Sequence, residues 1–335
     1  MKKTKIKFSR LWIAGAALVL LGAVSSCSKS SSGGGTPPPV APTNPGNYDS
    51  SNQIQPTELV AYWGFNNSLT ESKQNLTATS TGSLTYVTGV KGQALQGAAS
   101  SYGVYSGVGT ALPALGSFTI SFWINSAAVD TAFPTNTPGH GAQGIFFLAD
   151  TAGQFGNLGI DLEPYKGSAP GANPDTLQIK LSFHSYGTGV VWGGWGPELI
   201  LPGAVGKWTQ VVFTYNGGSG SLVGYVNGVQ GGVGSLAGPY GPFNGSETVY
   251  ANDPGSSTNT NNAPIMGNLV FKNMLAMEVG TWPWDTSPQL YTHAAVKGNN
   301  WEDDFHGQLD EMRIYNAALN STDVNSLYIL EKAGF

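Results

Sequence analysis

Two carboxylates are spaced as acid–base chemistry would require. Asp161 and Glu163 are alternate residues of a predicted strand, so their side chains share one face about 6.6 Å apart. Carboxylates at such a separation can act as a pair in glycoside hydrolysis. The structural interpretation is two exposed acids near the end of a strand that stops before Pro164, and it is the one that we favour.

A second acidic group, Glu302-Asp303-Asp304, lies beside Trp301 and His306. It offers oxygen ligands for a cation or acceptors for a sugar hydroxyl, although most acidic runs are simply solvated. The four histidines do not have the spacing of zinc ligands. The sequence also contains no Gly-x-Ser-x-Gly elbow, P-loop or dinucleotide-binding fingerprint, so these enzyme classes are not indicated.

Tryptophans outside the predicted strands carry the most information about binding. Five of the nine lie in or beside segments rich in Gly, Pro and Asn: Trp192, Trp195, Trp282, Trp284 and Trp301. A sugar ring has apolar C–H faces and polar edges, so a flat indole ring with a neighbouring Asp, Asn or Gln suits it. These five are the predicted ligand-binding residues. The alternative is that the loops fold back and their tryptophans form a satellite core.

Alternation of apolar and polar residues predicts the elements that position these side chains. Residues 117–125 and 176–185 both place four apolar side chains on one face, which is typical of antiparallel strands with one buried face. Asn227-Gly228 is a hairpin signal, and 320–328 predicts one short helix. The pattern predicts an all-β, two-sheet sandwich with long loops. Further strand-like runs occur at 59–65, 84–90, 144–149, 157–162, 207–215, 221–227, 267–271, 274–281 and 307–315.

Composition and charge limit the classes of partner. Only 10% of residues are charged, and Gly accounts for 47 of 335, which suits short strands and turns better than helices. Five of the fifteen basic residues lie in the first ten positions, so the remaining chain has a net charge of −10. Phosphate binding normally requires clustered Arg and Lys. Nucleic acid is therefore not an expected partner.

The N-terminus has the pattern of a bacterial lipoprotein. A basic segment and an apolar stretch too short to cross a bilayer end in Val24-Ser25-Ser26-Cys27, which resembles a lipobox. Cys27 is the one cysteine of the chain, so it has no intramolecular disulfide partner. We predict a signal peptide at 1–26, a lipidated Cys27 with a flexible Ser/Gly/Pro tether at 27–57, and a folded domain at 58–335. The lipid is the only predicted membrane anchor, and an ordinary secretory signal is the alternative.

Five motifs, in order, resemble those of a known superfamily. They are LVAYWGF at 59–65, GVKGQAL at 89–95, SFTISFWI at 117–124, the pair KWTQVVFTY at 207–215 and YVNG at 225–228, and GQLDEMRIYN at 307–316. This pattern, from about 58 to 330, is similar to the laminin-G-like jelly roll of the concanavalin A-like lectin and glucanase superfamily. The resemblance implies a two-sheet antiparallel jelly-roll sandwich. It implies less about function, because the superfamily contains lectins, glycosidases, adhesins and spacers.

The resemblance also indicates where to look for catalysis and for a metal. Glucanases of the superfamily carry Glu-x-Asp-x-Glu on one strand, and here Gly159 replaces the first glutamate, the nucleophile, while the last two acids are present. Retained glucanase activity is therefore not expected. In relatives, an aspartate at the position of Asp310 often binds a structural calcium ion, which requires oxygen ligands. The alternative for Asp310 is a salt bridge with Arg313 or Lys91.

These observations predict a lipoprotein of a Gram-negative outer membrane, at the cell surface or facing the periplasm, whose domain binds a polysaccharide or other glycan without covalent chemistry. One alternative is a diverged glycoside hydrolase that uses Asp161, Glu163 or Glu302. Another is an adhesion or spacer module that recognises protein. Two carboxylates across a cleft would favour the hydrolase, a face lined by Trp would favour glycan binding, and a broad apolar patch would favour the adhesin.

Overall fold

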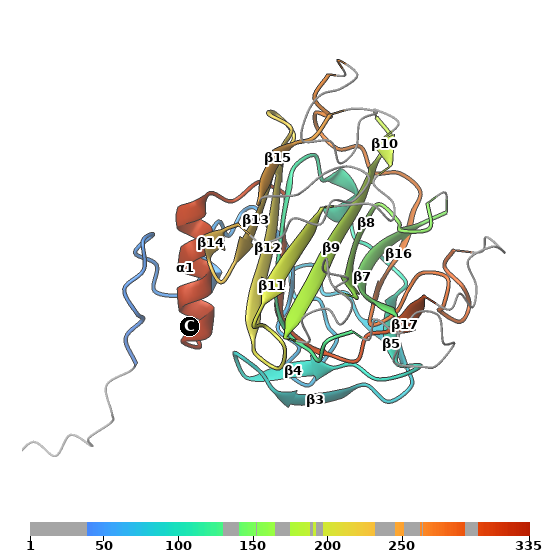
Figure 1. Ribbon diagram of the computed structural model, residues 1–335, viewed down its shortest axis with the longest axis horizontal. Helices are drawn as coiled ribbons and strands as arrows, with labels where there is room; N and C mark the ends of the chain where they lie inside the picture. Colours follow the sequence, from blue (N-terminus) through green and yellow to red (C-terminus); the bar gives the residue numbers. More distant parts are fainter. Residues whose placement is uncertain are drawn as a thin grey trace, which may run out of the picture. The chain divides into compact units, whose positions relative to one another are not determined.

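Two sheets form the body of the structure, which is a computed structural model. It describes residues 39–129, 141–151, 153–164, 175–187, 190–191, 197–231, 245–250, 262, 264–291 and 301–335. Residues Val40–Phe335 form one compact unit. Figure 1 shows the two sheets packed face to face within this unit.

The first sheet has the strand order β14-β13-β12-β6-β18-β4-β3, with β1 paired to β18 and β15 paired to β13. All of its described pairs are antiparallel. Its strands are β1 (Leu59–Trp63), β3 (Thr85–Thr88), β4 (Gln93–Gln96), β6 (Phe118–Asn125), β12 (Thr209–Asn216), β13 (Ser221–Val226), β14 (Val229–Gln230), β15 (Ser246–Thr248) and β18 (Gln308–Tyr315).

The second sheet has the strand order β10-β9-β8-β7-β16-β5-β2, with β11 paired to β9 and β17 paired to β7. Its described pairs are antiparallel except for β17 with β7. Its strands are β2 (Ala78–Thr81), β5 (Tyr102–Tyr105), β7 (Ala142–Asp150), β8 (Leu158–Glu163), β9 (Thr176–Ser185), β10 (Val190–Val191), β11 (Glu198–Pro202), β16 (Met274–Val279) and β17 (Glu302–Asp304).

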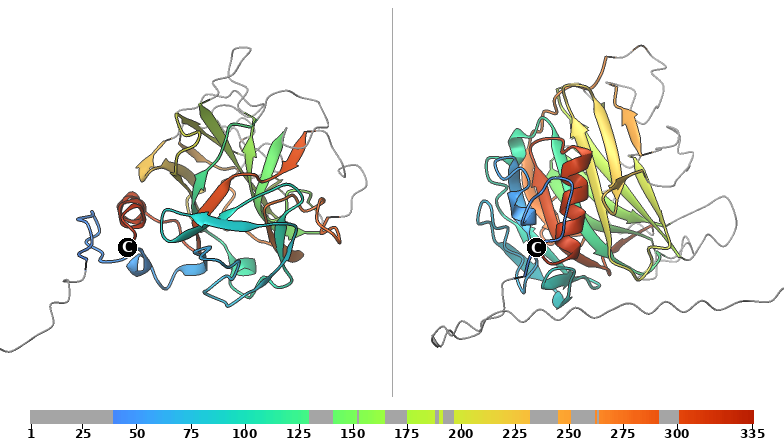
Figure 2. Two further views of the ribbon diagram at one scale, coloured as in Figure 1. Left: turned by 90° about the horizontal axis from the view of Figure 1, so that it is seen from below. Right: turned by 90° about the vertical axis from the view of Figure 1, so that its left-hand side faces the viewer.

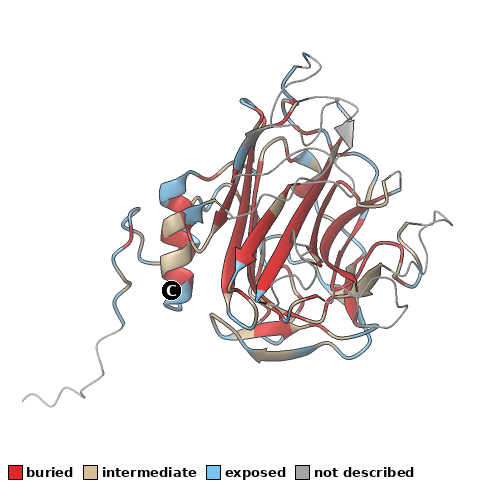
Figure 3. Ribbon diagram, viewed as in Figure 1, coloured by how far each residue is buried: buried red, intermediate tan, exposed pale blue. Residues whose placement is uncertain are grey.

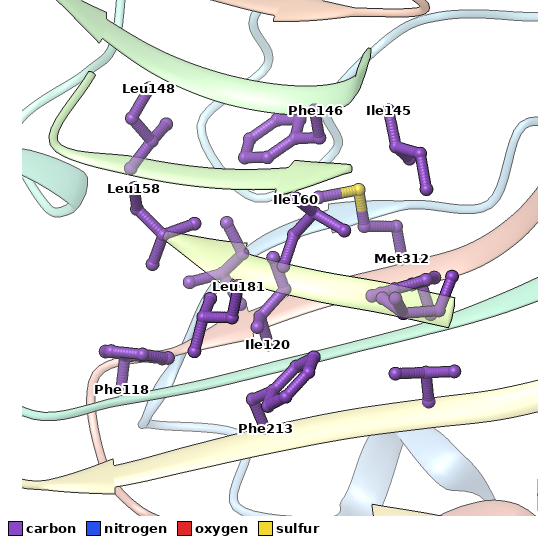
Figure 4. Packing of buried hydrophobic residues seen from close by; sticks show 14 of the residues in the cluster. Phe118, Ile120, Ile145, Phe146, Leu148, Leu158, Ile160, Leu181, Phe213 and Met312 are labelled. Carbon is purple, nitrogen blue, oxygen red and sulfur yellow. The ribbon is translucent and has the colours of Figure 1, made fainter. Parts of the chain in front are cut away.

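The core lies between the sheets, and it consists of the apolar residues that alternation predicts. Figure 4 shows Ile120 and Phe213 of the first sheet near Ile160 and Leu181 of the second, and all four are buried. Successive strand residues point to opposite faces, so the intervening residues form the outer faces. The predicted all-β jelly-roll sandwich is confirmed. Residues 267–271 are the exception, because they form no strand and Leu269 instead donates its N–H to the carbonyl of Gly116.

Helix α1 (Ser321–Lys332) covers the outer face of the first sheet (Figure 2). Asn320 caps it, because its side-chain oxygen accepts a hydrogen bond from the Asp323 N–H. The apolar side of the helix, including Val324 and Leu327, packs with Val212 of β12 and Tyr315 of β18. The short helix predicted at 320–328 is therefore confirmed. Two single 3₁₀ turns, η1 (Ser51–Gln53) and η2 (Leu112–Ala114), complete the described helical elements.

A buried ion pair joins α1 to the sheet beneath it. Arg313 of β18 donates from Nε to Glu331 of α1 over 2.7 Å and from Nη2 to Glu311 over 2.9 Å, and all three side chains are fully buried. Glu331 also accepts from Trp123 Nε1 at 2.7 Å. A buried charge is tolerated when it is paired and hydrogen-bonded in this way.

The segment before β1 is part of the folded domain. Tyr48 donates its hydroxyl to Asp323 of α1 over 2.7 Å, and Ser51 donates to the carbonyl of Phe335 over 2.6 Å. Ile54 is fully buried in the cluster beneath α1. The domain therefore begins before residue 58, and residues 40–57, which the sequence assigned to the tether, belong to the compact unit. The predicted signal peptide at 1–26 lies outside the described residues.

Candidate functional site

The outer face of the second sheet carries a row of polar side chains where β8, β9 and β11 lie side by side. Antiparallel register places Lys180 of β9 opposite both Asp161 of β8 and Glu198 of β11. Alternation then puts every second residue of each strand on the same face. We call this set the polar face; it consists of Asp161, Glu163, Gln178, Lys180, Ser182, His184 and Glu198.

Lys180 is the centre of the charges on the polar face. Its ammonium group lies 3.8 Å from Asp161 Oδ2 and 3.9 Å from Glu198 Oε1, and it donates to Glu163 Oε1. Burial raises the pKa of Asp161 well above its usual range, and the Glu198 charge raises that pKa further, against the lowering effect of Lys180. Glu163 and Glu198 are partly exposed, so solvent reaches the face at their end.

Several buried polar atoms of this face have no hydrogen-bond partner among the described residues. They include both carboxylate oxygens of Asp161, which is only 1% exposed, Gln178 Oε1, Ser182 Oγ and His184 Nδ1. Figure 3 shows that the strands bearing them are mostly buried. Buried polar groups in folded proteins are nearly always hydrogen-bonded. The buried, unpartnered carboxylate of Asp161 among them makes this face the candidate for a site at which a ligand could supply the missing donors and acceptors.

A second unpartnered carboxylate, Glu278 of β16, lies on the same outer face. It is fully buried, and that burial raises its pKa well above the usual range. Glu278 is opposite Phe147 of β7, which is in turn opposite Gly159 of β8. Phe147 therefore separates Glu278 from the polar face.

Gly159 has no room for a side chain. A Cβ at this position would lie 2.4 Å from Phe147 Cδ1 and 2.5 Å from Phe147 Cε1, well inside van der Waals contact. Phe147 is itself buried and packs against Trp282, with ring centroids 5.1 Å apart. The space that a side chain at position 159 would occupy is therefore filled by an aromatic ring.

Trp282 and Trp284 lie in a satellite core, the alternative that the sequence left open. Both are 0% exposed, and their ring centroids are 5.0 Å apart in a stacked arrangement. Trp282 donates from Nε1 to the carbonyl of Asp303, and Trp284 donates from Nε1 to Glu302. Trp301 is half-buried, and its ring centroid lies 5.4 Å from that of Trp282. Neither Trp282 nor Trp284 presents a ring face to solvent, and they occupy the outer face beside Phe147.

The acidic run at 302–304 is engaged within the protein. Asp303 pairs with His306 Nε2 at 2.8 Å, and this hydrogen bond raises the pKa of His306. Asp304 accepts from Thr281 Oγ1 at 2.6 Å and from the N–H of Ser100 at 2.7 Å. These contacts hold β17 against the segments that contain Thr281 and Ser100, so the acidic side chains have structural roles.

Asp310 accepts hydrogen bonds from backbone N–H groups and does not form the salt bridge with Arg313 or Lys91 that was one of the two predicted alternatives. Its Oδ2 accepts from the N–H groups of Val90 and Lys91, at 2.8 and 3.1 Å, and its Oδ1 accepts from the N–H of Glu311 at 2.8 Å. Arg313 instead pairs with Glu311 and Glu331. The carboxylate thus holds the turn between β3 and β4 against β18, and burial raises its pKa to about 7.

Calcium coordination requires six to eight oxygen ligands, whereas three N–H donors surround the Asp310 carboxylate. The described residues include no group of three or more His, Cys, Asp or Glu side chains arranged to hold a metal. The donors around Asp310 therefore do not fit a calcium ion, and the predicted calcium site remains to be tested by chelation.

Three of the predicted functional residues, Cys27, Trp192 and Trp195, lie outside the described residues. Conversely, Gln178, Lys180 and Ser182 were not predicted as site residues. Alternation in 176–185 placed them on the outer face of a strand, but the sequence did not indicate that this face is buried. Within the described parts of the chain, no helix is both long and apolar enough to span a membrane.

Comparison with solved structures finds weak likenesses over most of the chain. Domain 4 of AbnA, a GH43 extracellular arabinanase from Geobacillus stearothermophilus in complex with arabinotriose, is 19% identical, with a TM-score of 0.45 over 81% of this chain and 98% of that chain. The binding domain of botulinum neurotoxin DC in complex with SialylT is 12% identical, with a TM-score of 0.47 over 83% of this chain. The match spans about half of that toxin chain, 52%. No protein-family model and no curated protein matches the sequence.

Proposed function

We propose that this domain binds a glycan at the polar face and performs no covalent chemistry on it. The observation that carries the proposal is the group of buried, unpartnered polar atoms on Asp161, Gln178 and Ser182. A sugar hydroxyl both donates and accepts hydrogen bonds, so a polyhydroxylated ligand can satisfy carboxylate, amide and hydroxyl groups together. Because an unpartnered buried polar group is costly, satisfying these groups would favour the bound state.

The surroundings of Gly159 support a binding function over a hydrolytic one. Retaining hydrolysis needs a nucleophile facing a proton donor about 5–5.5 Å away. Phe147 fills the space that a side chain at position 159 would occupy. The remaining acids, Asp161 and Glu163, both pair with Lys180. They therefore lie side by side on one surface, whereas hydrolysis requires two carboxylates that face each other.

Trp192 and Trp195 remain the proposed stacking residues. Val191 pairs with His184, and the carbonyl of Pro197 accepts from the Leu181 N–H at 3.0 Å. Val191 and Pro197, the described residues on either side of Trp192 and Trp195 in the sequence, are therefore both paired to β9. Replacing either tryptophan by alanine is expected to reduce retention on polysaccharide.

We further propose that the protein is a lipoprotein of a Gram-negative outer membrane, held by acyl chains on Cys27. The support is the lipobox-like sequence after an apolar stretch that is too short to span a bilayer. Several acyl chains on one residue give stable anchoring, whereas one chain gives marginal binding.

The test of glycan binding compares two serines that differ in location. Ser182 and Ser121 are both fully buried strand residues with an unpartnered hydroxyl, but Ser121 lies on β6 of the first sheet. Removing an unpartnered hydroxyl should leave the free energy of unfolding unchanged or slightly higher. Ser182→Ala is therefore expected to weaken retention on the best-bound polysaccharide of a glycan array without lowering the melting temperature. Ser121→Ala should retain full binding. Equal binding by the two variants would exclude the polar face as the site, and no retention of the wild type on any glycan would refute the function.

A further inference from the structure

Two aromatic rings lie at one end of the polar face. His184 is the last residue of β9 on that face, where the strand pairs with β10 (Figure 1). Tyr186 follows two positions later, and its ring stacks on that of His184, with centroids 4.0 Å apart and an angle of 27° between the planes. Both residues are half-buried. The pair therefore offers solvent an aromatic surface, which the fully buried Trp282 and Trp284 do not.

The ring of Tyr186 is held in place through both its hydroxyl and its backbone. The hydroxyl donates to Asp150 Oδ2 over 3.0 Å, and the backbone N–H donates to the carbonyl of Val270 over 2.9 Å. Asp150 is itself fully buried, and its Oδ1 accepts from the N–H of Gly153 over 2.6 Å. A ring that is already fixed loses little conformational freedom when a ligand covers it, so less of the binding energy is lost to ordering.

A small space lies beside this pair, at Gly153. Apart from neighbours in the chain, the described atoms nearest to a Cβ built on Gly153 would all be polar: His184 Nδ1 at 3.6 Å, Asp150 Oδ1 at 3.7 Å and Asp150 Oδ2 at 3.8 Å. These are ordinary van der Waals distances, so the space has room for one more heavy atom. An oxygen a few tenths of an ångström closer to Nδ1 would be within hydrogen-bond distance of it.

The group that fits this space is a hydroxyl. His184 Nδ1 is buried and has no hydrogen-bond partner within the described part of the chain. Burial lowers the pKa of His184, against the raising effect of Asp150, so the imidazole is neutral near pH 7 and Nδ1 is either a donor or an acceptor. Because a hydroxyl both donates and accepts, it can satisfy Nδ1 in either tautomer.

We infer that His184, Tyr186 and Gly153 form an aromatic subsite of the polar face, in which the apolar C–H face of a sugar ring lies against the stacked pair and one hydroxyl enters the space at Gly153. The inference rests on the proposed function, because it adds a subsite to the same glycan site. A sugar ring combines an apolar face with hydroxyl groups at its edge, so one ring can use both halves of the subsite.

The experiment measures the dissociation constant of the full-length protein for the polysaccharide that it retains best on the glycan array. Tyr186→Leu removes the ring and is expected to weaken binding about fivefold or more, whereas Tyr186→Phe keeps the ring and should bind within about twofold of wild type. The control is Tyr48→Leu. Tyr48 is also half-buried and also donates to a carboxylate, that of Asp323, but it lies beside α1, so this variant should bind as wild type does.

Gly153→Ala tests the space without disturbing the fold. Its φ is not positive and its methyl would make only ordinary contacts, so the melting temperature should be unchanged or slightly higher. Binding should weaken about threefold or more, because the methyl excludes the hydroxyl from His184 Nδ1. Gly107→Ala is the control, since its methyl meets no atom within 4 Å, and it should bind as wild type does.

A double variant identifies the hydrogen bond that is lost. His184→Phe keeps an aromatic ring on Tyr186 but removes Nδ1, so it should weaken binding as Gly153→Ala does. Because both changes remove the same hydrogen bond, the two together should cost no more than the larger single effect. Effects that simply add would show that the space and Nδ1 serve different contacts, and would overturn the inference.

The remaining results separate the inference from the function. Equal binding by Tyr186→Leu and Tyr48→Leu would show that the ring does not contact the glycan. Equal binding by Gly153→Ala and Gly107→Ala would show that no sugar hydroxyl uses the space. Either result overturns the inference, whereas glycan binding that Ser182→Ala weakens would still stand. Absence of wild-type binding to every glycan would refute the proposed function and the inference together.

Discussion

Adding one methyl group at Gly159 tests whether the ring of Phe147 fills the space that a side chain at position 159 would occupy. The added Cβ would lie 2.4 and 2.5 Å from two ring carbons of Phe147 and 3.1 Å from the carbonyl oxygen of Phe155. Favourable contacts between carbon atoms are about 3.5–4.0 Å, so the methyl overlaps the ring by about 1 Å. Because the ring is buried against Trp282, it cannot move into solvent. We expect Gly159→Ala to lower the free energy of unfolding by about 1–3 kcal/mol, the usual cost of overpacking.

Gly107 provides the matched control. A Cβ at Gly107 meets no atom within 4 Å, and neither glycine has a positive φ. Gly107→Ala is therefore expected to be neutral or to stabilise the protein by about 0.4–1 kcal/mol through the unfolded chain. Both variants are compared by denaturant unfolding, in which a shift of the midpoint without a change of slope reports stability.

A second substitution identifies the ring as the cause. Phe147→Leu removes ring atoms from above Gly159, so Phe147→Leu combined with Gly159→Ala should cost less than the sum of the two single changes. The reasoning would be refuted if Gly159→Ala were no more destabilising than Gly107→Ala, or if the two effects simply added. In that case the position would have room for a side chain, and its lack of one would need another explanation.

Three further predictions concern the tryptophans, the anchor and Asp310. Trp282→Ala and Trp284→Ala should each lower the free energy of unfolding by about 3–5 kcal/mol, because both rings are fully buried; an unchanged melting temperature in either variant would contradict that packing. Cys27→Ser should release the protein from membranes, and a variant that still pellets with membranes after a high-salt wash would rule out the lipid anchor. Burial raises the pKa of Asp310 to about 7, so the folded state binds a proton that the unfolded chain has released, and this group's contribution to stability is lost as pH rises from about 4 to about 7. Asp310→Asn should flatten that part of the pH profile. Because N–H donors surround the Asp310 carboxylate, a chelator should change the melting temperature of wild type and of Asp310→Asn equally. A drop in melting temperature confined to wild type would establish a calcium ion at Asp310.

Long strands such as β6 and β9 could be predicted because each has one strictly apolar face. In β6, Phe118, Ile120, Phe122 and Ile124 must all leave water together, which only a period of two achieves. The hairpin at Asn227-Gly228 could also be predicted, since both residues adopt the positive φ that this turn needs. These features are local, so they are visible in a single sequence.

Burial of loops and of the segment before β1 could not be predicted, because it depends on contacts between distant residues. Tyr48 bonds to Asp323, 275 positions away, and nothing in the Pro-rich composition around residue 40 indicates such a partner. Similarly, Trp282 is enclosed by Phe147 and Trp301, which come from other parts of the chain. A Gly- and Pro-flanked tryptophan looks the same in the sequence whether it is exposed or enclosed.

Charged groups distinguish the two outer faces of the sandwich more clearly than burial does. Neutral polar atoms without a partner occur on both, for example Ser121 Oγ on the first sheet and Ser182 Oγ on the second. On the first sheet, however, the buried charges of Arg313 and Glu331 are fully engaged with each other and with neighbours. Among the described residues, the unpartnered carboxylates all belong to the second sheet, on Asp161 and Glu278.

This difference matches the position at which the chain enters the domain. The residues around Tyr48 and Ser51 bind to α1 and to the C-terminal Phe335, on the outer side of the first sheet (Figure 2). The polar face lies on the outer side of the second sheet, with the whole core between them. The described residues that precede β1 therefore lie on the side of the sandwich opposite the polar face, because their hydrogen bonds to α1 and to Phe335 hold them on the outer side of the first sheet.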